Sequence, residues 1–263
     1  MKIFLSAISD SEIDFFIRSG VKMKWNLLSF YQIYQMSEER GMAFFNKLLQ
    51  HSEEILIDSG AHSFQFGKKV NWDEYTEAYC DFIRKVDCPK IIGYFEMDVD
   101  NIIGYDKVLA LRRKIEQVTD KVIPVWHNTR GIADYKAMCQ EYAGKIVSIT
   151  GFKKAEFRDE QYPMFLNEAW KNKCRIHCLG MTRKEVMDKV PFDYTDSASW
   201  KLQHAYGMNY NPKTGKWQKV CKASTSRRNE GYMLNYIGGQ AMQEHYYLKW
   251  RKYNGHYNND WSK

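Results

Sequence analysis

Short apolar runs alternate with longer amphipathic segments along the first 200 residues, and this alternation limits the fold more than any other feature. The apolar runs cover residues 2–5, 55–57, 90–95, 121–126, 145–149 and 175–179. Each is short and mostly apolar, as expected for a parallel strand that is buried on both faces. Helical spacing occupies residues 10–18, 25–35, 42–50, 72–84, 106–118, 132–142 and 183–188.

Strands that alternate with helices predict an α/β protein with a parallel sheet. Six or seven such units within about 200 residues favour a closed (β/α)8 TIM-like barrel over an open doubly wound sheet. No G-x-G-x-x-G motif follows any of the apolar runs, which weakens the dinucleotide-binding alternative. We therefore expect a barrel over residues 1–200.

Residues 201–263 differ in composition from the rest of the chain. They hold eleven Lys and Arg against three Asp and Glu, together with eleven Tyr and Trp. Basic and aromatic side chains in one segment suit contact with phosphates and bases, although a solvated basic face would look the same. A polar, turn-rich stretch at 209–215 precedes a predicted helix at 230–253. We expect this segment to form a C-terminal appendage packed on the barrel, either as its last unit or beside its mouth.

The apolar runs are too short to cross a membrane, and the first six residues are too short for the core of a signal peptide. The expected location is the cytoplasm, which would be the host cytoplasm if a phage encodes the protein. Six scattered cysteines show no disulfide framework, so reduced thiols are expected.

Acidic residues follow several predicted strands. In barrel enzymes the working side chains come from these carboxyl-terminal strand ends. Asp58-Ser59-Gly60 follows one run, Asp98 and Asp100 follow the next, and Asp193 and Asp196 lie in a seventh short segment at 191–200. A single aspartate after a strand often caps the next helix. Several of them around one mouth would provide a nucleophile and a proton carrier, as in retaining glycosyl transfer.

In order and placement these residues resemble the tRNA-guanine transglycosylase superfamily. The resemblance covers residues 55–200 and includes Asp58-Ser59-Gly60, Asp98, Gly151, Gly180 and the Asp193/Asp196 pair. The ending Pro-Phe-Asp-x-x-Asp-Ser-x-Ser-Trp is most similar to the shorter phage and bacterial branch, the DNA-guanine transglycosylases that place 7-deazaguanines in DNA.

The resemblance implies roles for individual residues. Asp196 would attack C1′ of the target nucleoside and form a covalent glycosyl-aspartate, with Asp193 as its competitor for that role. Asp58 would act as general acid and base. Asp98 would read the base, and Ser59, Gly60, His127, Gly151 and Gly180 would line its pocket; His127 stands where the tRNA enzymes usually have a Gln.

The tRNA enzymes also carry a Cys-x-Cys-x-x-Cys zinc cluster after the nucleophile, whereas only Cys221 follows Asp196 here. We therefore expect no structural zinc, no other metal and no cofactor; Cys174 and Cys178 are interpreted as packing residues. The short chain and its basic end favour DNA over tRNA as the partner, with a free 7-deazaguanine base as co-substrate. The residues that we expect to contact the DNA backbone are Lys213, Lys216, Lys219, Lys222, Arg227 and Arg228.

Three other interpretations remain open at this point. The chain could exchange bases in tRNA, it could be a retaining glycoside or nucleoside hydrolase that uses water as acceptor, or it could be a non-catalytic nucleic-acid-binding accessory protein. The oligomeric state, the DNA sequence context and the 7-substituent of the base are not encoded in any recognisable motif.

Overall fold

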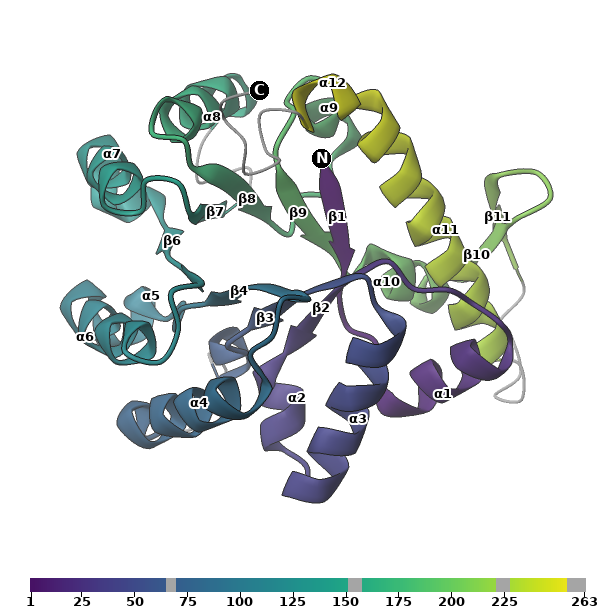
Figure 1. The fold of residues 1–263 in the computed structure, drawn as a ribbon. Helices are drawn as coiled ribbons and strands as arrows, with labels where there is room; N and C mark the ends of the chain where they lie inside the picture. The colour runs from purple at the N-terminus through teal and green to yellow at the C-terminus, as the bar shows by residue number, and fades with distance from the viewer. Residues whose placement is uncertain (65–69, 151–157, 221–227, 255–263) are drawn as a thin grey trace.

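The computed structural model describes residues 1–64, 70–150, 158–220 and 228–254. Within them the chain forms an α/β fold in which helices surround a parallel, nearly closed, barrel-like sheet (Figure 1). The nine strands of this sheet are β1 (Lys2–Leu5), β2 (Trp25–Ser29), β3 (Glu54–Asp58), β4 (Ile91–Phe95), β5 (Val122–Ile123), β6 (Val125–Trp126), β7 (Ile146–Thr150), β8 (Arg175–Leu179) and β9 (Tyr194–Ser197). The strand order is β5-β4-β3-β2-β1-β9-β8-β7-β6.

The two outermost strands of this order, β5 and β6, are consecutive in the chain and flank Pro124. Val122 and Ile123 pair with β4, whereas Val125 and Trp126 pair with β7. Proline has no N–H to donate, so it interrupts a ladder where it stands. One stretch of five residues, 122–126, thus contacts both sides of the opening and brings the sheet close to closure.

Helices follow most strands and cover the outer surface of the sheet. They are α1 (Asp10–Arg18), α2 (Phe30–Tyr34), α3 (Glu38–His51), α4 (Trp72–Val86), α5 (Asp100–Ile103), α6 (Tyr105–Glu116), α7 (Gly131–Glu141), α8 (Tyr162–Lys171), α9 (Lys184–Met187), α10 (Ser199–Ala205), α11 (Arg228–Lys249) and α12 (Arg251–Asn254), with short 3-10 turns η1 (Ala61–Phe64), η2 (Asn128–Arg130) and η3 (Asp159–Gln161). In the described part of the chain, no helix combines the length and apolar character needed to cross a membrane.

The predicted helix at 25–35 is wrong over its first half, because residues 25–29 form strand β2 between β1 and β3. A short apolar run has no periodicity that separates a buried strand from a buried helix. The predictions also lack helices α5, α8 and α10 and a two-stranded antiparallel hairpin of β10 (Met208–Asn211) and β11 (Lys216–Lys219). The six predicted strands are confirmed, with the run at 121–126 divided by Pro124.

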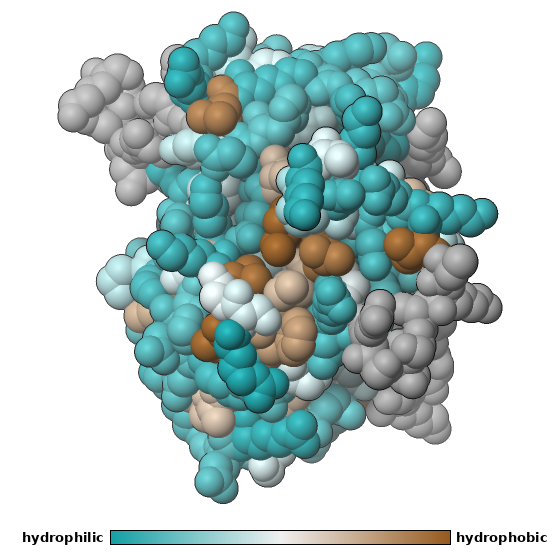
Figure 2. Space-filling model, turned by 90° about the vertical axis from the view of Figure 1, so that its right-hand side faces the viewer, coloured by the Kyte–Doolittle hydropathy of each residue, from teal (hydrophilic) through white to brown (hydrophobic). Residues whose placement is uncertain are grey.

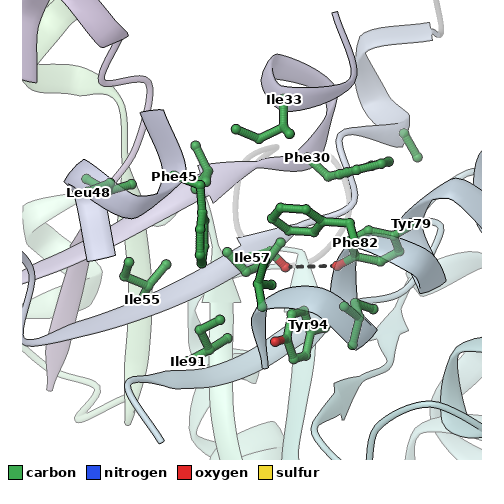
Figure 3. Packing of buried hydrophobic residues seen from close by; sticks show 14 of the residues in the cluster. Phe30, Ile33, Phe45, Leu48, Ile55, Ile57, Tyr79, Phe82, Ile91 and Tyr94 are labelled. Carbon is green, nitrogen blue, oxygen red and sulfur yellow. Dashed lines mark hydrogen bonds between the residues drawn. The ribbon is translucent and has the colours of Figure 1, made fainter. Parts of the chain in front are cut away.

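Successive side chains of each strand point alternately outward and inward, so there is an outer core between the sheet and the helices and an inner core inside the sheet. Ile55 and Ile57 of β3 pack outward against the covering helices, among aromatic residues such as Phe30 and Phe82, and the hydroxyl of Tyr79 donates to the Ile57 carbonyl at 3.3 Å (Figure 3). Leu56 instead packs inside the sheet with residues from other strands, among them Phe4, Leu27 and Phe95. Because side chains alternate, Asp58 continues the inward-facing row of Leu56.

Helix α11 packs along the barrel wall (Figure 1). The Gln243 side chain donates to the carbonyls of Ile3 in β1 and Trp25 in β2, at 2.7 and 2.9 Å. The buried Tyr236 hydroxyl donates to Asn26 Oδ1 at 2.7 Å. These buried polar contacts join the C-terminal segment to the two strands next to the N-terminus.

Candidate active site

Asp58 and Asp196 both point into the barrel at the carboxyl ends of their strands. Asp196 is the third residue of β9 and lies two positions after Tyr194, which packs in the inner core. Residues two positions apart in a strand point to the same side, so Asp196 also points inward. Asp58 is the last residue of β3 and lies in register with Ser29 of β2. Because β3 and β9 run in the same direction and both side chains point inward, the two carboxyl groups lie at the same end of the barrel.

Burial dominates the electrostatics of Asp58. Burial is the largest cause of the rise in the pKa of this carboxyl to about 7; the negative charges of Asp98 and Asp196 add to the rise, and hydrogen bonds from Gly60 and Ser29 oppose it. The Gly60 N–H donates to Asp58 Oδ2 at 3.0 Å. Asp58 ends β3, Asp98 follows β4 and Asp196 is near the end of β9, so the three aspartates belong to the same, carboxyl-terminal end of the barrel.

The Asp196 carboxyl is held from the neighbouring strand. The Gly180 N–H, just after β8, donates to Asp196 Oδ1 at 2.8 Å. Burial raises the pKa of Asp196 to about 6, and the Gly180 hydrogen bond opposes that rise. The pKa of both carboxyl groups is therefore raised toward neutral pH, that of Asp58 more than that of Asp196.

His177 lies under Asp196 inside the barrel and is not among the residues that the sequence predicts for the site. Its Nε2 is 3.7 Å from Asp196 Oδ1, its side chain is fully buried, and neither ring nitrogen has a hydrogen-bond partner among the described residues. Burial lowers the pKa of His177 to about 3, so the ring is neutral and does not offset the Asp196 charge. Its only signal in the sequence is a polar residue between Ile176 and Cys178, inside a mostly apolar strand that begins with Arg175.

Asp98, Asp100 and His127 form a second group of side chains at the same end of the barrel. Asp98 and Asp100 follow β4, and His127 follows β6. The ring Nε2 of His127 is hydrogen-bonded with Asp98 Oδ1 and lies 3.7 Å from Asp100 Oδ1. The sequence predicts no role for Asp100, although its Asp-x-Asp spacing with Asp98 is visible there.

The remaining predicted pocket residues divide into two groups. Gly60 and Gly180 hold the aspartates through their N–H groups, as described above. Ser59 is 1% exposed and its hydroxyl donates to the Glu96 carbonyl at 2.8 Å, so it ties β3 to β4 and does not present its hydroxyl to the mouth. Gly151 lies outside the described residues.

Asp193 is not part of this mouth. It precedes β9 and therefore lies at the opposite, amino-terminal end of the barrel. Its Oδ2 accepts hydrogen bonds from the Ile176 N–H at 2.8 Å and from Trp170 Nε1 at 3.1 Å, and the residue is 2% exposed. The structure separates the Asp-x-x-Asp pair, because three residues along a strand span roughly 10 Å.

Some of the residues that are predicted to contact the DNA backbone lie on the β10–β11 hairpin. Lys213, Lys216 and Lys219 are exposed there, beside Trp217, which is 38% exposed. Arg228, at the start of α11, donates to the Tyr232 hydroxyl at 3.1 Å. Lys222 and Arg227 lie outside the described residues. Figure 2 shows the face of the molecule that lies on the right of Figure 1 as largely hydrophilic, with a few hydrophobic residues gathered near its middle.

The hairpin is fixed to α11. The Tyr210 N–H donates to Asn235 Oδ1 at 2.8 Å, and Asn235 Nδ2 donates to the Met208 carbonyl at 2.9 Å. The three lysines therefore sit on an anchored element.

Five cysteines of the described chain are free thiols: Cys80, Cys88, Cys139, Cys174 and Cys178. Cys174 and Cys178 are fully buried in one apolar cluster, which accounts for their spacing by packing.

Comparison with models of protein families, with curated protein sequences and with solved structures finds no match.

Proposed function

We propose that the chain is a DNA-guanine transglycosylase, which exchanges guanine in DNA for a 7-deazaguanine through a covalent glycosyl-aspartate. In this proposal the fold is a (β/α)8 TIM-like barrel in which β5 and β6 count as one strand interrupted at Pro124, and residues 201–263 form its basic, aromatic appendage. The observation that carries the proposal is the pair of inward-facing carboxyl groups, Asp58 and Asp196, with pKa values raised to about 7 and about 6.

Two carboxyl groups with different pKa values suit a double displacement at C1′. Ionised Asp196 attacks C1′ and forms a C1′–O bond as the C1′–N9 bond breaks, while protonated Asp58 gives its proton to the leaving guanine. The ionised Asp58 then takes a proton from the incoming 7-deazaguanine. The N9 nitrogen of that base attacks C1′, and the bond to Asp196 breaks.

The hydrogen bond from Gly180 supports Asp196 as nucleophile over Asp193. It fixes one carboxylate oxygen and so orients the group. Asp193 is buried at the other end of the barrel and accepts hydrogen bonds from Trp170 and Ile176, which suits a structural role. Asp98 and His127 would border the base, Asp98 as acceptor for its N–H groups.

DNA is proposed as the polymer because of the exposed lysines of the hairpin. Lys213, Lys216 and Lys219 with Trp217 offer charge for phosphates and a ring for an unstacked base. The target nucleotide must leave the helix for C1′ to reach a carboxylate inside a barrel. The proposed setting is the cytoplasm, that of the host if a phage encodes the chain.

In the experiment, the purified protein is incubated with a radiolabelled 7-deazaguanine and with duplex DNA, single-stranded DNA or tRNA. The label incorporated into each polymer is then measured. We expect label in DNA and none with Asp196→Asn. Label in tRNA alone would favour the tRNA-acting alternative. Release of free sugar or base without incorporation would favour a hydrolase, and binding without either reaction would favour an accessory protein.

A further inference from the structure

Asp98, Asp100 and His127 bring three potential metal-ligand atoms together at the barrel mouth. One side-chain atom of each residue lies within 4.8 Å of the other two. The side chains are partly buried, with 23%, 9% and 14% of their surface exposed. They come from two different strand ends, so the barrel itself brings them together.

Asp100 gives an independent indication that this group of side chains binds a ligand. Its side chain is nine-tenths buried, and its Oδ1 accepts no hydrogen bond from the described residues. The same oxygen faces His127 Nε2 at 3.7 Å. A buried carboxylate oxygen without a partner is unfavourable, and such atoms are rare in folded proteins. A cation between the two side chains would satisfy it.

The backbone around the two aspartates is held firmly. Val99, which lies between them, is 1% exposed and packs in the outer core, and its N–H donates to the Met97 carbonyl at 2.9 Å. The carboxylate of Glu96 is bound by buried Arg112. Asp98 and Asp100 therefore flank an anchored residue, and a metal ion would meet a largely preformed pair of carboxylates.

We propose that Asp98, Asp100 and His127 bind one divalent transition-metal ion of the Zn²⁺ or Mn²⁺ class. Magnesium and calcium favour sites made of oxygen alone, whereas an imidazole nitrogen beside carboxylates suits first-row transition metals. Three protein ligands leave a coordination position for water or a ligand, as in catalytic zinc sites. The inference concerns binding alone and does not rest on the proposed reaction; if both hold, Asp98 binds the ion through one carboxylate oxygen and accepts from the base through the other.

The experiment is a calorimetric titration of chelator-treated full-length protein with Zn²⁺, Mn²⁺, Mg²⁺ or Ca²⁺, without nucleic acid. We expect one Zn²⁺ or Mn²⁺ per chain and weaker binding of Mg²⁺ and Ca²⁺. Asp100→Asn and His127→Gln should each weaken Zn²⁺ binding by at least about tenfold. Asp106→Asn removes an exposed carboxylate a few residues away and should leave the affinity within about twofold.

A thermal melt of each variant without metal provides the folding control. Asp100→Asn removes a buried, unpartnered charge and should melt no lower than the wild type. When Zn²⁺ is added, the wild type and Asp106→Asn should gain more thermal stability than Asp100→Asn and His127→Gln. Absence of stoichiometric binding would overturn the proposal, as would binding that Asp100→Asn and His127→Gln leave unchanged. Because no nucleic acid is present, either result is independent of base exchange.

Discussion

Arg112 and Glu96 form an ion pair in which both side chains are 1% exposed. Arg112 Nε donates to Glu96 Oε2 at 2.6 Å and Nη2 donates to Oε1 at 3.2 Å. Glu96 also accepts the Val125 N–H, and its backbone carbonyl accepts the Ser59 hydroxyl. The pair therefore joins the ends of β3, β4 and β6, from which Asp58, Asp98 and His127 project.

Arg112→Met should destabilise the protein strongly, because it leaves the Glu96 carboxylate buried without its partner. We expect a decrease of about 3–5 kcal/mol in the free energy of unfolding, measured by denaturant titration. The control is Arg113→Met in the same helix, where the half-exposed Arg113 pairs with Glu116 and Glu141 at the surface. The control should decrease it by about 1 kcal/mol or less. Equal decreases would show that burial does not govern the contribution of this pair.

The rate of base exchange should depend on pH in a bell shape. Asp196 must be ionised to attack, so the rate falls as the pH drops below its pKa of about 6. Asp58 must be protonated to assist the leaving guanine, so the rate falls as the pH rises above its pKa of about 7. Single-turnover rates from acidic to alkaline pH would measure both limbs, which belong to the interacting pair of carboxyl groups.

In Asp58→Asn the alkaline limb should disappear and the rate should fall by about 10²–10⁴-fold. An unchanged alkaline limb in this variant would assign the proton transfer to another group.

Gly60 is predicted to be irreplaceable at its position. Its φ is +74°, and an added Cβ would lie 2.4 Å from the Cβ of Tyr31 and 2.7 Å from Ser29 Oγ. Gly60→Ala should therefore displace the loop that holds Asp58 and reduce both stability and activity. Gly131 has the same φ of +74° but open space around a new Cβ. Gly131→Ala should cost only about 1–2 kcal/mol, from backbone strain. Similar melting temperatures for the two variants would contradict the steric argument.

The hairpin lysines should carry part of the affinity for DNA. Replacing Lys213, Lys216 and Lys219 by Ala should weaken binding, and the slope of log K against log salt should become shallower by about 0.9 for each phosphate that a lysine no longer neutralises. The matched control replaces Lys85, Lys107 and Lys121, which pair with surface carboxylates. Lys85 and Lys107 belong to α4 and α6, which lie across the sheet from the hairpin (Figure 1). Fluorescence anisotropy at several salt concentrations measures both slopes. If the control triple variant binds as weakly, net charge and not the hairpin governs binding.

Part of the fold could be predicted from the sequence because parallel strands leave a direct signal. Runs such as 2–5 and 175–179 are mostly apolar, are buried over most of their length and match the observed strands residue for residue. Strand β2 was missed because Trp25–Ser29 mixes apolar and polar residues, yet all of them are buried or nearly so. Asn26 can be buried because its side chain is hydrogen-bonded to Ser52 and Tyr236. Such long-range partners leave no local signal in the chain.

The candidate site shows the same limit. Asp58 and Asp98 could be predicted because the first ends a recognisable strand and the second follows one, whereas Asp196 is identified by the resemblance of the segment 191–200 to a family motif. Asp193 is grouped with Asp196 by its spacing, but position along a strand decides which end of the barrel a residue occupies. His177 and Asp100 could not be given a role from the sequence, since their importance depends on partners, Asp196 and His127, that lie far along the chain.

The most direct test of the proposed reaction is to locate the covalent intermediate. The protein is incubated with DNA in the absence of free base, denatured rapidly and digested, and the peptide that carries the nucleotide is identified by mass spectrometry. We expect an adduct on Asp196, its disappearance in Asp196→Asn and its persistence in Asp193→Asn. An adduct on Asp193, or base exchange that proceeds at the wild-type rate in Asp196→Asn, would contradict it.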